Sequence, residues 1–283
     1  MSYSNLTIPR TSQSGFSLVE LIITIVLGGI VASMTTSILT QPIQAYMDSS
    51  RRATLTASAD AALLRMQRDV RRALPNSIRI SADGQTLELL HLIDGGRYRA
   101  KLASDGSGNL LDFSGDSSFE AFKPLALFSD QLSINNDRVV IYPLNSSGNN
   151  PYAGDNTAVI TNIASATAQT STISFSAFTF PLASPQQRFF IIDTAVTYHC
   201  DTSPTLAKDK VLMRYDGYGI LSSQALPPSS GGGIQSNNIE SCSFSYDSGS
   251  STRSGLVTLQ LVLTDDEGES VRLLHQVHVD NQP

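Results

Sequence analysis

Charged residues are scarce in this chain, at 16% of 283 residues, and histidine and cysteine number only four and two. The formal net charge of −6 argues against nucleic-acid binding as the main task, because that task calls for a basic surface. So few histidines and cysteines leave too few nearby ligands for a zinc site. The sequence has no Gly-x-Ser-x-Gly elbow, no phosphate-binding loop and no His-Glu-x-x-His motif. We therefore expect neither an enzyme nor a nucleic-acid partner.

A long apolar run near the N-terminus is the main feature that is present. It extends from Phe16 to about Leu39, and a helix needs about 20 such residues to cross a bilayer. The run contains one acid, Glu20, which should have a specific partner because a carboxylate in hydrocarbon costs a few kcal/mol or more. A secretory signal peptide is one alternative, but it would have to end near Ser33, which makes its core too long. An uncleaved anchor is the other alternative.

The stretch Gly15-Phe-Ser-Leu-Val-Glu-Leu-Ile-Ile-Thr24 resembles the type IV prepilin signature. In that family a membrane protease cuts after the glycine and methylates the new N-terminal residue. The resemblance implies a cut between Gly15 and Phe16, methylation of Phe16, and Glu20 as the glutamate used in assembly. On a helix, Phe16 and Glu20 lie one turn apart on the same face. The dipole also favours a carboxylate near a helix N-terminus, so Glu20 can pair with its own amine or with a neighbour's.

The resemblance also implies partners and a location. The partners are other minor and major pilins, contacted through N-terminal helices, together with the prepilin peptidase and the pilus assembly platform in the inner membrane. The protein would cross the inner membrane once, with its leader in the cytoplasm and its globular domain in the periplasm, and could later stand near the tip of the extracellular pilus. The distribution of basic residues does not decide the orientation in the membrane, because Arg10 lies before the apolar run and Arg51-Arg52 lie after it.

The fold class expected is α+β and pilin-like, with a long N-terminal transmembrane and amphipathic helix packed on an antiparallel β-sheet domain. Pro42 should kink this helix and Pro75 should end it at Leu74. An apolar stripe at three- and four-residue spacing is predicted to face the sheet, at Ala59, Ala62, Leu63, Met66, Val70 and Leu74. The predicted segments are a leader at 1–15, a transmembrane segment at 16–40, an amphipathic continuation at 41–75 and a β-rich globular domain at 76–283.

From residue 76 on, short alternating runs separated by turn residues indicate β structure. The clearest hairpin pairs 256–264 with 271–279. Segments 145–157 and 223–238 are expected to be loops, because Asn, Ser, Gly and Pro dominate them. The other predicted strands are 77–80, 86–92, 98–102, 110–113, 138–142, 158–163, 172–176, 188–192, 195–200, 210–215, 218–222 and 241–246.

Cys200 and Cys242 are the two cysteines, and in a periplasmic domain they are most simply interpreted as one disulfide. A bond that closes a loop of about 40 residues would contribute about 3 to 4 kcal/mol. Two buried free thiols are the alternative.

Two turns carry oxygen side chains in a pattern that calcium could use. They contain Asp105 with Asn109, and Asp265 with Glu267. Neither completes a known loop with a bidentate glutamate at the right distance, so plain hairpin turns explain them better. We therefore expect no cofactor and no metal, with calcium as the alternative.

The C-terminal half carries a further resemblance, to the MshO-type minor pilins of the mannose-sensitive haemagglutinin (MSHA) pilus system. The segments concerned are 188–200, 214–218, 255–261 and 274–279. The many strands are also similar to the J-class minor pseudopilins of type II secretion. The resemblance implies a minor pilin that helps to initiate or cap a pilus. The alternatives are a pilus-tip adhesin that binds surface glycans and a minor pseudopilin of a type II secretion system.

Overall fold

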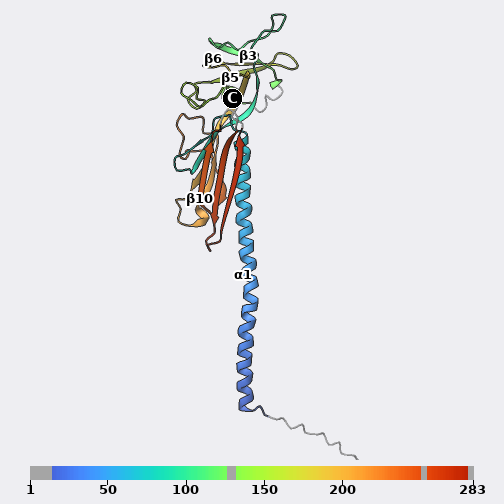
Figure 1. The fold of residues 1–283 in the computed structure, drawn as a ribbon, viewed down its shortest axis with the longest axis vertical. Helices are drawn as coiled ribbons and strands as arrows, with labels where there is room; N and C mark the ends of the chain where they lie inside the picture. The colour runs from blue at the N-terminus through green and yellow to red at the C-terminus, as the bar shows by residue number, and fades with distance from the viewer. Residues whose placement is uncertain (1–14, 126–131, 250–253, 280–283) are drawn as a thin grey trace, which may run out of the picture. The chain divides into compact units, whose positions relative to one another are not determined.

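The computed structural model describes residues 15–125, 132–249 and 254–279. The chain divides into two compact units, one up to Ser50 and one from Arg51 on. Helix α1, Leu18–Arg71, begins in the first unit and ends in the second, where strands follow it (Figure 1). The strands are β1 Arg79–Ile80, β2 Thr86–Arg97, β3 Asp116–Ala121, β4 Arg138–Ile141, β5 Thr157–Ser165, β6 Ser171–Phe178, β7 Arg188–Asp201, β8 Val211–Tyr215, β9 Gly232–Asn237, β10 Ile239–Asp247, β11 Gly255–Thr264 and β12 Ser270–Val279, with a short 3-10 helix, η2, at Ala207–Asp209.

One face of α1 is buried within the second unit. The buried positions recur every three or four residues, as a helix packed on one side requires. They pack against β2, β7 and β8 of one sheet and against β10, β11 and β12 of another. The predicted α+β, pilin-like fold is confirmed. The residues of this face, which we call the apolar stripe, are Leu55, Ala59, Ala62, Leu63, Met66 and Val70.

Helix α1 ends at Arg71, so the predicted end at Leu74 was wrong by three residues. The N–H of Leu74 donates to the carbonyl of Leu90, and the N–H of Leu92 donates to the carbonyl of Arg72, each at 2.9 Å. The main chain therefore pairs with β2 before it reaches Pro75. Pro42 lies inside α1, with helix assigned on both sides of it, and the kink there stays a prediction.

Strand β7 is the central strand of the larger sheet. It pairs along its length with β2 on one side. On the other side it pairs first with β4 and then with β8. Because both edges and both faces are used, most of its side chains are buried, which explains the nearly continuous apolar sequence at 188–200.

A second core fills the part of the unit formed by β3, β4, β5 and β6, which Figure 1 shows well away from β10. Aromatic rings dominate this core. Phe119 lies 5.4 Å from Phe189 and 5.9 Å from Phe175 between ring centroids, in tilted or edge-on arrangements that aromatic pairs favour. Strand β7 contributes to both cores, so it joins them into one unit.

A disulfide joins Cys200 on β7 to Cys242 on β10, with a Cα–Cα distance of 6.3 Å. The two strands belong to different sheets. The bond therefore connects the larger sheet covalently to the three-stranded sheet, beside the apolar stripe of α1.

Several strand predictions were wrong. Segments 110–113 and 218–222 contain no strand, and strands β3 and β9 form where none was expected. Side chains hold segment 218–222 in place instead, because Arg79 donates to the carbonyls of Leu221 and Ser222 at 2.9 and 2.8 Å. Strand β9 begins with two glycines, and it forms because it pairs with β8 rather than from its own propensity.

The hairpin prediction for 256–264 and 271–279 is confirmed by β11 and β12, which pair over ten residues from Gly255–Val279 to Thr264–Ser270. Side chains on β11 alternate between buried and half-buried along the whole strand. This alternation is the pattern from which the hairpin was predicted.

Leu63 and Leu64 offer a matched test of the apolar stripe. Leu63 is fully buried, whereas Leu64 is 47% exposed on the same helix turn. Replacing Leu63 with Ala should lower the free energy of unfolding by about 2–5 kcal/mol, because it leaves a cavity in the core. Leu64→Ala should change it by less than about 0.5 kcal/mol. Denaturant unfolding of the full chain in detergent micelles measures both, and equal effects would contradict the packing described.

The disulfide should stabilise the domain mainly by restricting the unfolded chain. The two cysteines are 42 residues apart, and closing a loop of that length is worth about 4 kcal/mol in the chain-entropy model. Replacing both Cys200 and Cys242 with Ser should lower the free energy of unfolding by about that amount. Treating the wild type with a reductant should give a similar loss and leave the double variant unchanged. A wild type insensitive to reductant would show that the bond does not form.

Candidate processing and assembly site

The motif at the N-terminus lies where helix α1 begins. Residues Gly15 to Ser17 are not helical, and α1 starts at Leu18. The hydroxyl of Ser17 accepts a hydrogen bond from the N–H of Glu20 at 3.2 Å, and the carbonyl of Ser17 accepts one from the N–H of Leu21 at 3.1 Å. Ser17 is therefore the N-cap, and it satisfies backbone donors that a helix start otherwise leaves free.

The sequence carried a signal for this cap that our sequence analysis missed. Ser17 followed by Glu20 three positions later is the capping-box pattern, and an apolar run comes directly after it. The cap fixes the start of α1 two residues after Phe16. Cleavage after Gly15 would leave the new amine within one turn of Glu20.

Glu20 lies in the first turn of α1 and is exposed, as is Phe16, which is 77% exposed. Within the described residues, no hydrogen bond or ion pair is recorded for the Glu20 carboxylate. The helix dipole favours a negative charge at this end. In an apolar environment this carboxylate still requires a positive partner from outside its own chain or from the processed N-terminus.

The apolar run itself is exposed within its unit. Its large side chains are 46% exposed or more, from Phe16 to Ile38, where the structure describes them. By length and composition α1 is long and apolar enough to cross a membrane. The surface must therefore be covered by lipid or by other apolar helices, which is consistent with a membrane-anchored pilin.

Residues 10–36 match the family model described as the prokaryotic N-terminal methylation motif. The match covers Gly15, Phe16 and Glu20 together with most of the apolar run. It indicates a type IV pilin-like prepilin signal, of the kind that the prepilin peptidase processes. No curated protein and no solved structure matches the chain.

At the two turns considered for calcium, Oδ1 of each aspartate accepts hydrogen bonds from its own turn. Oδ2 of Asp265 is buried without a hydrogen-bond partner among the described residues, and Asn109 donates to the hydroxyl of Ser118. Asp105 accepts hydrogen bonds from the N–H and the hydroxyl of Ser107 at 2.9 and 2.6 Å. Asp265 likewise accepts from the N–H groups of Glu267 and Glu269, at 3.1 and 2.8 Å. In the described part of the chain, no three His, Cys, Asp or Glu side chains gather as a metal site would require. The expectation of plain turns without a metal, with calcium as the alternative, stays a prediction.

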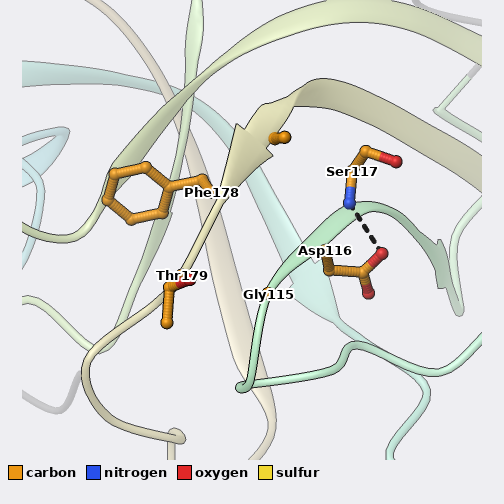
Figure 2. A pocket seen from close by; sticks show the side chains of 6 residues that line it. Gly115, Asp116, Ser117, Phe178 and Thr179 are labelled. Atoms are coloured by element: carbon orange, nitrogen blue, oxygen red, sulfur yellow. Dashed lines mark hydrogen bonds between the residues drawn. The ribbon is translucent and has the colours of Figure 1, made fainter.

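A hollow of about 520 Å³ lies between the start of β3 and the end of β6. Figure 2 shows Asp116 and Phe178 on its two sides. Asp116 accepts hydrogen bonds from the N–H groups of Ser117 and Ser118, and from that of Asp112 at 2.9 Å. The carboxylate of Asp116 already accepts hydrogen bonds from its own turn. It therefore offers little charge-based recognition to a surface glycan in this hollow.

A second hollow, of about 510 Å³, has Arg71, Arg72 and His91 among its lining residues. Nδ1 of His91 lies 2.9 Å from Oδ1 of Asp193 on β7. This hydrogen bond raises the pKa of His91 against the opposing effect of burial. The charge of Asp69 on α1 raises the pKa further, and that of Arg214 on β8 lowers it.

The pairing of His91 with Asp193 predicts a pH-dependent stability. The pKa of folded His91 lies above its unfolded value of about 6.5, so the pair stabilises fully below that pH and loses its effect as pH rises through the folded pKa. The gap in unfolding free energy between wild type and His91→Gln should therefore be larger at pH 5.5 than at pH 8.5. Asp193→Asn should abolish the same pH-dependent component. Urea unfolding at the two pH values measures it, and a gap that widens with pH would contradict the assignment.

Proposed function

We propose that this protein is a minor pilin that helps to initiate or cap assembly of a type IV pilus of the MSHA type. It acts after the prepilin peptidase has cut between Gly15 and Phe16 and methylated Phe16. The observation that carries the proposal is the methylation motif at residues 10–36, with Glu20 in the first turn of an exposed apolar helix. Its partners are other pilins, the peptidase and the assembly platform of the inner membrane.

Glu20 is the residue that we assign to assembly. When subunits pack their apolar helices together, the carboxylate pairs with the N-terminal amine of a neighbouring subunit. Such a pair, removed from water, fixes the register between helices because the wrong register leaves a charge alone. The Ser17 cap holds Glu20 in the first turn, where this amine can reach it.

The size of the domain supports the role of a minor pilin rather than that of a subunit repeated along the pilus shaft. The second unit begins at Arg51 and contains two sheets and a covalent bond between them, which is more than a repeated shaft subunit is expected to carry. The resemblance of segments 188–200 and 255–261 to MshO-type minor pilins supports the MSHA system in particular. These segments form the central strand β7 and most of β11.

Processing is tested by the mass of the N-terminal peptide. In native cells, membrane and sheared-fibre fractions should both yield a peptide that begins at N-methylated Phe16. Gly15→Leu should leave an intact leader, because a bulky residue before the cut does not suit a narrow protease cleft. A wild-type protein that keeps Met1 in every fraction would refute processing. The Phe16 peptide in membranes alone would instead favour a minor pseudopilin of a secretion system.

Incorporation is tested by removing the charge at Glu20. Glu20→Ala should keep the Phe16 peptide in membranes but reduce the protein in sheared fibres by about tenfold or more, since an unpaired desolvated charge costs about 3–5 kcal/mol. Asp209→Ala is the matched control, because it removes an exposed carboxylate from η2, which has no role in the proposed assembly. Quantitative immunoblots of both fractions measure the ratio. Equal incorporation of Glu20→Ala and wild type would refute the role given to Glu20.

A further inference from the structure

The last turns of α1 form a basic hollow with the neighbouring strands β7 and β8. Its volume is about 290 Å³. We call it the arginine hollow. Its lining residues are Arg65, Arg68 and Asp69 of α1, Arg72 directly after the helix, Tyr198 of β7 and Arg214 of β8.

The single acid of the arginine hollow is already paired. Oδ2 of Asp69 accepts hydrogen bonds from the hydroxyl of Tyr198 and from Nε of Arg214, both at 2.8 Å. Burial, reinforced by Asp69, raises the pKa of Tyr198, so this hydroxyl stays protonated and donates. Arg214 also pairs with Asp216. Asp69 and Asp216 therefore both pair with Arg214, and no ion pair links either of them to Arg65, Arg68 or Arg72 in the described residues. Arg72 also borders the separate hollow that contains Asp94 and Asp193.

Three arginines of the hollow remain, Arg65 and Arg68 in α1 and Arg72 directly after it. They stand at positions i, i+3 and i+7, and the N–H of Arg72 still bonds to the carbonyl of Arg68, so they share one side of the helix end. Nη1 of Arg65 donates to the neutral amide oxygen of Gln235 at 3.0 Å. No hydrogen bond or ion pair of the Arg68 and Arg72 side chains is recorded within the described ranges, and both residues are exposed. The hollow thus concentrates positive charge on a chain whose formal net charge is −6.

We propose that the arginine hollow binds the carboxylates of an acidic peptide segment on a neighbouring subunit. A guanidinium presents its N–H groups as a planar fork that matches a carboxylate, and such charge-assisted bonds are stronger than neutral ones. This inference rests on the proposed function, because it requires a subunit packed beside α1.

The spacing of the arginines favours a peptide over a single small anion. Arg72 follows Arg65 by seven residues, which at the rise of a helix is about 10 Å, and all but the last of these residues belong to α1. An extended chain covers that distance in about three residues. A short acidic run fits this length, and folds of this kind present such runs: the β11–β12 turn of this chain exposes Asp266 and Glu267.

The position of the hollow disfavours lipid headgroups. Arg51 and Arg52 are the first bases after the apolar run. Arg68 lies 16 residues beyond Arg52 on the same helix, which is about 24 Å. The headgroup region of a bilayer adds only about 5–8 Å on each side of its core. Headgroups at the level of Arg51 and Arg52 therefore do not extend to Arg68.

Binding of labelled octaglutamate to the purified full chain in detergent micelles tests the proposal. Fluorescence anisotropy at physiological salt gives the affinity, with octaglutamine as the uncharged comparison. The variant replaces both Arg68 and Arg72 with Gln, and both residues are exposed, so the fold should persist. Arg97→Gln is the matched control, because Arg97 is exposed at the end of β2 and does not line the hollow.

The wild type and Arg97→Gln should bind octaglutamate alike, and neither should bind octaglutamine. The double variant should bind at least about tenfold more weakly, since charged hydrogen bonds of this kind are lost. Equal affinity in the double variant, or no binding by the wild type, would overturn the proposal. Binding of inorganic phosphate without binding of octaglutamate would assign a small-anion site and also overturn it. Peptide processing at Phe16 is measured separately, so either hypothesis can fail while the other stands.

Discussion

Burial of one face of α1 between two sheets is the interaction on which the folded domain depends. The apolar stripe packs against β2, β7 and β8 on one side and against β10, β11 and β12 on the other. Without the helix, the inner faces of both sheets would be open to water. Helix α1 also carries the methylation motif and its apolar run. One element therefore organises the core of the domain and contains most of the residues that match the methylation motif.

Charged side chains in this protein differ in whether the domain itself supplies their partners. Glu88 is satisfied locally within the domain, because its fully buried side chain pairs with Arg79 and accepts a hydrogen bond from Tyr218 at 2.8 Å. The described residues supply no such partner to the carboxylate of Glu20 or to the side chains of Arg68 and Arg72. A buried charge without a partner is costly, so a completed domain pairs its charges. The unpaired charges mark the places where we infer that other subunits complete the structure.

Local periodicity accounts for what could be predicted from the sequence. The apolar stripe of α1, the β11–β12 hairpin and the position of the motif all follow from patterns within about 20 consecutive residues. Strands β3 and β9 could not be found this way, because β9 begins with Gly232 and Gly233 and acquires its structure by pairing with β8. The arginine hollow also could not be predicted from the sequence, since Arg214 and Asp69 are 145 residues apart. The Ser17 cap could have been predicted from the spacing of Ser17 and Glu20, but our sequence analysis did not predict it.

The bond between Cys200 and Cys242 has a mechanical consequence. A subunit held by its helix and loaded through its domain is under tension, and the chain between these cysteines contains β8, β9 and the turns around them. If those elements separated from β7, the disulfide would prevent the chain between the two cysteines, which are 42 positions apart, from extending under load. The bond thereby prevents the release of about 140 Å of extended chain. The domain can lose hydrogen bonds at this edge under load and still keep its length.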